Sequence, residues 1–418
     1  MHRTKLHYAL LLIGALYLSA CGGGSLSSSN QQPRPTGTAI AVKFTGGAPL
    51  AIAEEIGTGN WTTASLQNGA LGLTVPQGTS TYAIAYLCPT WQGMGPVSSE
   101  YVLQATIKDA TSYSVTCYVN PTLGTISGSA NVSAIANATQ FRVYGAQGIS
   151  SNVVTATSGP FSFQAPTGTN DIAVVAYDSS NNLVGVKFVR NQTVPGAVSS
   201  TITLSSNDAT TNTQTMADSN IQSGFLPTPA GPYAEYATAN GTFFYLSNVN
   251  TNTTQYPVMP ASEVQSGDYY YFSSNDANSS NQHVLAWQSV TTPAPITLAF
   301  PNPLSYAAPT PAKFPTFTVN YGGFSGASAV SYAANIQWIT NATDNGITVT
   351  ATAAYLNGAT NIAIPDLTSL SGFLPSPVSG STIYWFVYGY GGTYQTFTPM
   401  PAPANIAAVQ NTGTYTQP

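Results

Sequence analysis

The sequence predicts an all-β protein, built as three or four tandem antiparallel β-sandwich modules behind a flexible N-terminal tether. Apolar and polar residues alternate in short runs, as at Ile40, Val42 and Phe44 and through residues 347–355. This period of two is typical of half-buried strands. Clusters of Gly, Pro, Asn and Ser, which favour turns, separate the runs. The mature chain lacks a convincing helical period, so stacked sheets are favoured over alternating strands and helices.

Residues 1–20 have the anatomy of an export signal. Arg3 and Lys5 precede an almost uninterrupted apolar run at 9–20, which leads into Leu18-Ser-Ala-Cys21. A transmembrane anchor is the alternative, but the run is shorter than the ~20 residues that a spanning helix needs. The segment resembles the signal peptide and lipobox of a bacterial lipoprotein. This resemblance implies that residues 1–20 are removed and that Cys21 becomes the lipidated, palmitate-bearing N-terminus.

The residues that follow Cys21 indicate where such a protein would lie. Gly22 stands where an aspartate would favour retention in the inner membrane, so the resemblance implies the outer membrane. A single acyl chain anchors a protein only marginally, whereas the two or three chains of a lipoprotein anchor it effectively permanently. Residues 21–36 are rich in Gly, Ser and Pro and predict a flexible tether, with a mean span of ~20–25 Å.

The composition is poor in charge. Only 6% of the 418 residues are charged, against an ordinary share of about 25%. Removal of Arg3 and Lys5 leaves 7 basic and 14 acidic residues, a formal charge of −7 (7 − 14). The basic residues are scattered, so nucleic-acid binding has no electrostatic basis. A surface of neutral Ser, Thr, Asn and Gln predicts solubility that changes little between about pH 3 and pH 7.

Residues 37–120 and 121–205 are expected to form two similar modules. Both contain a strand, the turn sequence Pro-x-Gly-Thr and a second strand, at an offset of 90 residues (161 − 71). Proline fixes φ and glycine supplies a positive φ, so the tetrapeptide predicts a tight connection. The matching positions are Leu71, Leu73, Pro76, Gly78, Thr79 and Ala83 in the first module and Phe161, Phe163, Pro166, Gly168, Thr169 and Ala173 in the second. In the second module, residues 171–177 and 183–189 predict a hairpin around a turn at 178–182.

The second module contains Gly124-Thr-Ile-Ser-Gly128, and Gly159-Pro-Phe-Ser-Phe-Gln-Ala-Pro-Thr-Gly168 followed by Ile172-Ala-Val-Val175. On these motifs it resembles the carboxypeptidase regulatory-like, prealbumin-type modules of exported proteins. The resemblance implies a small, seven-stranded, Ig-like sandwich. Such modules carry no catalytic residues, so the resemblance implies a fold and little about activity.

Cys88 and Cys117 are expected to form a disulfide. An exported protein meets an oxidising compartment, and each cysteine shares its strand face with large apolar residues. Closing a loop of about 30 residues would stabilise the fold by roughly 3–4 kcal/mol in the chain-entropy model. Two buried free thiols are the alternative.

The C-terminal half has less certain boundaries in the sequence. Residues 206–222 are polar and predict a linker, followed by β-rich modules at 223–308 and 309–418. Gly224-Phe-Leu-Pro-Thr-Pro229 recurs almost unchanged as Gly372-Phe-Leu-Pro-Ser-Pro377. This spacing leaves open whether the last two modules are separate or form one unit.

Catalytic motifs are weak. The mature chain has one histidine, His283, at the start of an expected strand. Gly323-Phe-Ser-Gly-Ala327 lacks both the last glycine and the helix of a nucleophile elbow, and is interpreted as a loop. A hydrolase is the least favoured function, because it requires two carboxylates, or His283 with a serine, to converge in a cleft.

The acidic residues do not form a recognisable site in the sequence. Glu54 and Glu55 are adjacent and would face opposite sides of a strand. Asp178-Ser-Ser-Asn-Asn182 has oxygen donors but is better explained as a turn than as a calcium loop. We therefore expect no metal and no cofactor. Four further acids, isolated in sequence, could meet only through folding: Glu100, Glu235, Glu263 and Asp268.

The remaining candidate is aromatic. Tyr384, Phe386, Tyr388 and Tyr390 would share one face of a strand, with Trp385 on the other. Asp268-Tyr-Tyr-Tyr-Phe272 is a similar run. Aromatic faces stack on sugar rings, and Asn, Gln and Thr suit sugar hydroxyls; a packed sandwich core is the alternative explanation.

These observations predict a non-catalytic, lipid-anchored protein of the cell envelope that binds a glycan or another surface polymer. The alternative is a structural or assembly lipoprotein that contacts envelope proteins. The first function requires an accessible aromatic strip, whereas the second requires a broad uncharged patch at a module junction.

Overall fold

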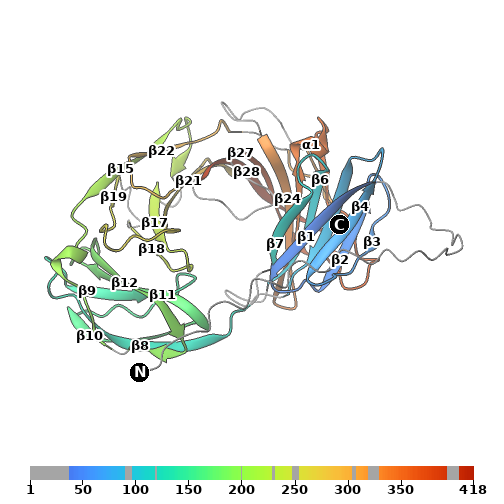
Figure 1. The fold of residues 1–418 in the computed structure, drawn as a ribbon. Coiled ribbons are helices and arrows are strands. Elements are labelled where there is room, and N and C mark those ends of the chain that lie inside the picture. Colours follow the sequence, from blue (N-terminus) through green and yellow to red (C-terminus); the bar gives the residue numbers. More distant parts are fainter. Residues whose placement is uncertain are drawn as a thin grey trace, which may run out of the picture. The chain divides into compact units, whose positions relative to one another are not determined.

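The computed structural model describes residues 37–418 except 90–96, 118–119, 199, 228–230, 247–253, 304–306, 319–328 and 393–403. The expected signal peptide, lipidated Cys21 and tether therefore lie outside the described residues. The described chain is all-β, as predicted, with strands β1 to β28 and two very short helices (Figure 1). No helix among the described residues is long and apolar enough to cross a membrane.

Residues 37–117 form two facing sheets around one core. One sheet has the order β4-β1-β7, and the other contains β3-β2-β5-β6. Apolar side chains alternate along β1 and β4, so Ile40, Val42 and Leu73 point toward Tyr82 and Ile84 on β5. The strand bounds are Gly37–Gly46 (β1), Ala51–Ile56 (β2), Thr62–Thr63 (β3), Ala70–Pro76 (β4), Thr81–Leu87 (β5), Val97–Thr106 (β6) and Ser112–Cys117 (β7).

Residues 123–203 repeat this arrangement, with sheets β10-β8-β13 and β12-β11-β9. β8 pairs antiparallel with β10 and parallel with β14, as β1 pairs with β4 and β7. Gly78 and Gly168 of the repeated turn both have positive φ, 91° and 109°. The sandwich-like sheets agree with the predicted type of module. The strand bounds are Leu123–Asn131 (β8), Gln140–Tyr144 (β9), Ser158–Pro166 (β10), Gly168–Tyr177 (β11), Leu183–Val194 (β12), Gly196–Ala197 (β13) and Ile202–Thr203 (β14).

The predicted hairpin of the second module is confirmed. β11 and β12 pair antiparallel, with Ile172 opposite Val189. Asp178 organises the turn between them, because its Oδ1 accepts hydrogen bonds from the N–H groups of Ser180 and Asn182, both at 2.8 Å.

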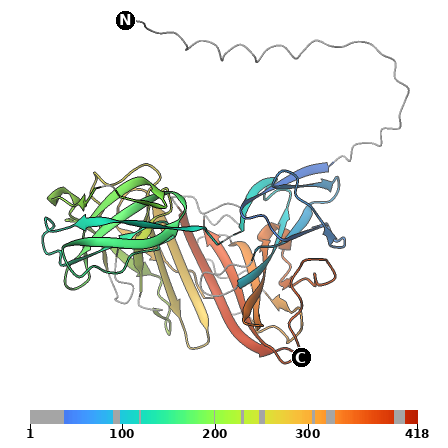
Figure 2. The same cartoon turned by 90° about the horizontal axis from the view of Figure 1, so that it is seen from below.

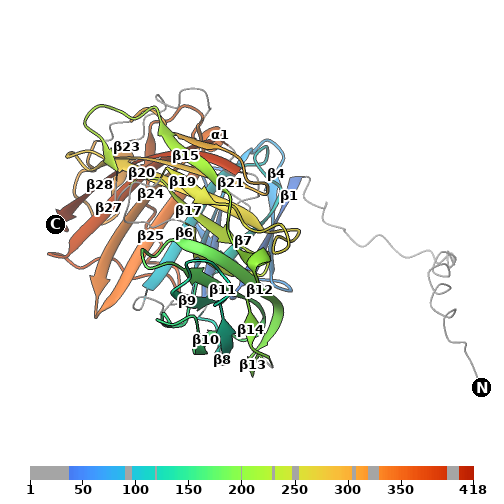
Figure 3. The same ribbon diagram turned by 90° about the vertical axis from the view of Figure 1, so that its left-hand side faces the viewer.

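A 13-stranded sheet extends from the C-terminal half into the first module (Figures 2 and 3). Its order is β18-β17-β20-β21-β28-β27-β24-β25-β6-β5-β2-β3, with β16 paired to β20. β25 joins β6 in parallel, from Asp344 opposite Val97 to Ala351 opposite Gln104. The remaining bounds are Leu226–Pro227 (β16), Tyr233–Ala237 (β17), Phe243–Tyr245 (β18), Tyr269–Ala277 (β20), Gln282–Val290 (β21), Ala329–Thr340 (β24), Thr343–Thr352 (β25), Thr382–Gly392 (β27) and Ala404–Thr416 (β28).

Two small sheets and one side of the β12-β11-β9 sheet pack on one face of this long sheet and enclose the largest core. Met216 and Phe317 from the small sheets meet Tyr270, Trp338 and Val387 from the long one. We call the side of the long sheet that faces this core its inner face, and the opposite side its outer face. The small sheets comprise β15 (Thr213–Ser219), β19 (Gln255–Pro257) and β22 (Ile296–Ala299), and β23 (Thr316–Thr318) and β26 (Asn361–Ala363).

Two segments differ from their expected local structure. Part of the polar segment 206–222 forms the 3-10 helix η1 (Ser206–Asp208) and strand β15, because Met216 enters the core. The strand expected through residue 355 ends at Thr352. The Thr352 hydroxyl accepts the Tyr355 N–H at 3.0 Å and caps the helix α1 (Ala353–Leu356), which turns the chain away from the sheet.

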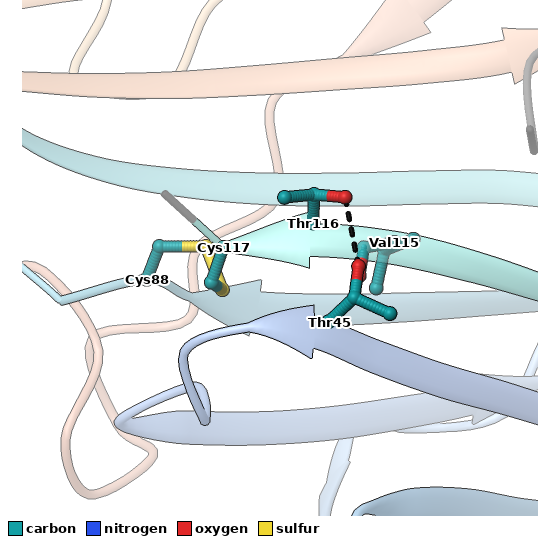
Figure 4. Close-up of a disulfide and its surroundings, with 5 residues drawn as sticks. All are labelled: Thr45, Cys88, Val115, Thr116 and Cys117. Atoms are coloured by element: carbon teal, nitrogen blue, oxygen red, sulfur yellow. Dashed lines mark hydrogen bonds between the residues drawn. A yellow bond between two sulfur atoms is a disulfide. The ribbon is translucent and has the colours of Figure 1, made fainter. Parts of the chain in front are cut away.

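Cys88 and Cys117 form the predicted disulfide, with Cα atoms 5.2 Å apart (Figure 4). Both cysteines are buried in the core of the first module. Cys88 follows β5 and Cys117 ends β7, so the bond joins the two facing sheets. Beside it, the hydroxyls of Thr45 and Thr116 hydrogen-bond at 2.9 Å across the β1–β7 pair.

Candidate functional site

The candidate site is a row of aromatic side chains on the outer face of β27. Tyr384, Phe386, Tyr388 and Tyr390, which we call the aromatic strip, alternate along β27 with core residues. Tyr384 is 46% exposed, and the other three are half-buried. Trp385 points the other way, as its parity predicted. It is only 6% exposed and packs against a core aromatic ring, so the strip does not include it.

Neighbouring rings of the strip lie nearly parallel. The ring centroids of Phe386 and Tyr388 are 6.3 Å apart, and those of Tyr388 and Tyr390 are 5.7 Å apart, each with a 12° angle between planes. Residues i and i+2 of a strand stand about 6.6 Å apart on one face, which brings these rings into contact. Burial raises the pKa of Tyr388 to about 12. A tyrosine hydroxyl is protonated at neutral pH even at its ordinary pKa of about 10, so it can donate a hydrogen bond.

Uncharged side chains flank the strip on both neighbouring strands. Residues that pair directly across antiparallel strands share one face. Among the described residues that pair with the strip in this way, no side chain is charged, and most are amides or hydroxyls. On β24 these are Ser331, Ala333, Asn335 and Gln337, and on β28 they are Ala408, Gln410, Thr412 and Thr414.

The second aromatic run of the sequence reaches the same outer face from another strand. β20 carries Tyr269 and Tyr271 on this face, while Tyr270 and Phe272 are fully buried in the core. β21 and β28 separate β20 from β27, and the pairing is regular throughout. The sequence shows the parity of each run, but only the strand order reveals that the two runs share a face.

Among the residues that the structure describes, the other candidate catalytic groups do not assemble into a site. His283 is partly buried, its Nδ1 lies 3.3 Å from the amide oxygen of Asn275, and burial lowers its pKa. The loop 323–327 lies outside the described residues. Glu54 and Glu55 lie on β2, and burial raises the pKa of each. Among the described residues, no group of three or more His, Cys, Asp or Glu could hold a metal ion.

Two of the isolated acids contact Arg190, Asp268 through its carboxylate and Glu263 through its main-chain carbonyl. The Arg190 guanidinium lies 3.0 Å from Asp171 Oδ2 and 2.7 Å from Asp268 Oδ2, and donates to the Glu263 carbonyl oxygen at 2.6 Å. It also covers the Phe188 ring at 4.1 Å. Both aspartates are buried. These contacts link strands β11 and β12 to the segment before β20, so the cluster is structural.

Hydrogen bonding determines the ionisation of Asp171 in this cluster. Burial alone would raise its pKa, but hydrogen bonds outweigh burial and leave the pKa lowered. The strongest of them come from the backbone N–H of Asn191 and the side chain of Asn240.

A different pair of carboxyls converges at the first Gly-Phe-Leu-Pro sequence. Asp218 accepts a hydrogen bond from Ser274 Oγ at 2.8 Å, and burial and the charge of Asp276 raise its pKa to about 6. Asp276 is fully buried, and neither of its carboxylate oxygens has a hydrogen-bond partner among the described residues. Asp276 has no exposed surface, so the two carboxyls do not face each other across an open cleft.

The second Gly-Phe-Leu-Pro sequence has its own buried acid, Glu100. The Leu374 N–H donates to Glu100 Oε2 at 3.3 Å, and burial, with Asp366, raises the pKa of Glu100 to about 7. Asp218 and Asp366 each stand six residues before the glycine of their copy (224 − 218 and 372 − 366). An aspartate shared by both copies is the sequence signal that could have located these carboxyl pairs.

Comparison with known proteins finds no matching family model and no matching curated protein sequence.

Proposed function

We propose that this chain is a non-catalytic, lipid-anchored protein of the bacterial outer membrane, whose aromatic strip binds a glycan or another uncharged surface polymer. The observation that supports binding is the position of the strip. It lies on the outer face of β27, away from the core, with Tyr384 exposed and neutral hydrogen-bonding side chains on both neighbouring strands.

The chemistry of the strip suits a sugar chain. One face of a pyranose ring carries polarised C–H bonds that pack against the negative face of an aromatic ring. A row of aligned rings offers successive contacts to successive sugars. The amide and hydroxyl groups of Gln337, Gln410 and Thr414 can exchange hydrogen bonds with sugar hydroxyls. Because none of these groups is charged, we expect binding that depends little on salt.

A double substitution of the strip tests this proposal. Tyr384→Ala with Tyr388→Ala removes two outward rings and leaves the core residues of β27 in place. We expect about tenfold or more loss of affinity for the glycans that the unaltered chain binds, because each aromatic contact contributes roughly 0.5–1.5 kcal/mol.

The assay is a glycan array followed by titration calorimetry with the full chain in detergent. Leu50→Ala is the matched control, because Leu50 is 63% exposed and lies outside the strip. Equal affinity of the double variant and the control would refute a role for the strip. Capture of envelope proteins without any glycan would favour the assembly function instead.

The lipid anchor is tested separately. Labelled palmitate should enter the unaltered chain in cells and should not enter the Cys21→Ala chain. Globomycin, which blocks lipoprotein signal cleavage, should leave the signal attached. Unprocessed, unlabelled protein would refute the anchor, whatever the glycan assay shows.

A further inference from the structure

A cluster of tyrosines surrounds Glu235 at the far end of the same outer face. Glu235 lies in the middle of β17, directly opposite Tyr245 on β18 and Tyr271 on β20. Such cross-strand neighbours have Cβ atoms about 4.5–5.5 Å apart on one face. Tyr233 precedes Glu235 by two residues on the same face, and Tyr269 occupies the diagonal position beside Tyr271. Four phenol rings therefore flank one carboxyl group.

The cluster is separate from the core. The intervening residues Ala234, Tyr236 and Phe244 point inward and are 0–1% exposed. Tyr245 is 46% exposed, so the cluster is open to solvent on the β18 side. The rings of Tyr233 and Tyr245 meet edge to face, with centroids 5.9 Å apart and planes at 71°.

Uncharged polar side chains surround the acid. The Tyr245 hydroxyl partly offsets the rise in the pKa of Glu235, and the Ser273 side chain does the same for Tyr233 and Tyr271. None of these neighbours carries a positive charge that would neutralise Glu235.

The charge of Glu235 acts on every ring of the cluster. Burial raises the pKa of all four tyrosines. The negative charge of Glu235 is the second cause of the raised pKa of Tyr245 and Tyr269, and a smaller cause for Tyr233 and Tyr271. Burial raises the pKa of Glu235 itself, and the hydrogen bond from Tyr245 opposes that shift. Among the described residues, no Lys, Arg or His side chain pairs with Glu235. The site therefore combines one acid with four electron-rich rings and no described countercharge.

We propose that this cluster binds an alkylammonium group, such as the free amine of an amino sugar or a choline-type headgroup. Aromatic ring faces attract cations through their quadrupoles, and several rings around one point form the kind of cage that recognises quaternary ammonium groups. Glu235 adds a full negative charge on the strand between the rings. A neutral molecule of the same shape would contact the rings but gain nothing from the acid.

The site is distinct from the aromatic strip, and the proposal does not rest on it. β17 lies four strand spacings from β27 in the sheet, which is about 19 Å. The strip has neutral neighbours and suits an uncharged ligand, whereas this cluster requires a positive one.

The test compares choline with its neutral isostere 3,3-dimethyl-1-butanol, by titration calorimetry on the full chain. We expect choline to bind about tenfold or more tightly than the isostere, since only choline carries the charge. Glu235→Gln should lower choline affinity about tenfold and leave the weak binding of the isostere unchanged. Glutamine has nearly the same shape as glutamate, so we expect the variant to fold, and a thermal melt checks this.

Two further variants localise the site. Tyr245→Ala removes the most exposed ring of the cluster and should also weaken choline binding, whereas Tyr384→Ala in the strip should not.

Glucosamine and N-acetylglucosamine distinguish the sources of the ammonium group. If glucosamine binds and N-acetylglucosamine does not, the ligand is an amino sugar with a free amine. If choline binds and neither sugar does, the ligand is a quaternary ammonium headgroup. Equal binding of choline and its isostere, no binding of any cation, or an unchanged Glu235→Gln variant would overturn the proposal.

Discussion

Glu100 is a buried acid whose ionisation should oppose folding. It lies on β6 between Leu87 of β5 and Ile347 of β25, and it is 1% exposed. The Leu374 N–H donates to Oε2 at 3.3 Å, but Oε1 has no hydrogen-bond partner among the described residues. Burial and the nearby Asp366 raise the pKa of Glu100 to about 7, despite that hydrogen bond. We predict that Glu100→Gln stabilises the protein at high pH and not at low pH.

The magnitude follows from the shift. The pKa of Glu100 rises from an ordinary 4.5 to about 7 on folding. A carboxyl with a raised pKa is protonated more readily in the folded state than in the unfolded state, so its contribution favours folding at low pH. That contribution is lost as the pH rises from about 4.5 to about 7, and the total loss is about 3 kcal/mol. Glutamine is neutral throughout and avoids this loss.

Denaturant unfolding at a series of pH values provides the measurement. Below about pH 4.5 the variant and the unaltered chain should unfold with similar free energies. By pH 8 the variant should be more stable by up to about 3 kcal/mol. Asp366→Asn is the matched control, because it removes the repelling charge and should shift the midpoint of the pH dependence downward without changing the low-pH plateau. Parallel pH curves for the Glu100→Gln and unaltered chains would refute a penalised ionisation of Glu100.

Two further substitutions test the structural assignments. Replacing Cys88 and Cys117 by serine should cost about 3–4 kcal/mol of unfolding free energy, since the disulfide spans 29 residues, and unchanged denaturant midpoints would contradict this. Arg190→Met should cost about 3–5 kcal/mol, because it leaves Asp171 and Asp268 buried without their cation. Lys187→Met is its control and should cost about 1 kcal/mol or less, because the Lys187 side chain in its pair with Asp208 is 34% exposed. Equal costs for the two substitutions would argue against the Arg190 cluster as a buried link.

Local patterns predicted the elements of the fold and some of their partners. Alternation placed Tyr384 and Trp385 on opposite faces of β27, and parity placed Cys88 and Cys117 in one core. Alternation alone does not show whether a strand face is exposed to solvent or buried under another part of the chain. β5 alternates in the same way, yet both of its faces are buried, since Tyr82 lies in the core of the first module and Ala85 in the largest core.

The long sheet and the Glu235 cluster depend on contacts far apart in sequence. β6 and β25 pair in parallel between residues about 250 positions apart, a pairing that no turn specifies. Glu235 gains its surroundings from β18 and β20, and Tyr271 lies 36 residues beyond it (271 − 235). Periodicity predicts which face a residue occupies, but not which strands lie beside it.

Among the described residues, two groups of acids have shifted pKa values and opposite pH dependence. Hydrogen bonds and ion pairs lower the pKa of Asp171 and of Asp208 despite burial, so their stabilisation is present above the ordinary value of 3.8 and is lost as the pH falls below it. Burial raises the pKa of Asp218 to about 6 and that of Glu100 to about 7, so stability is lost as the pH rises toward these values. Both groups favour folding together only near pH 4, because the contribution of the second group declines as the pH rises above the ordinary values of 3.8 and 4.5. The unfolding free energy should therefore have its maximum near pH 4, and a steady increase from pH 4 to pH 8 would show that the buried acids do not control stability.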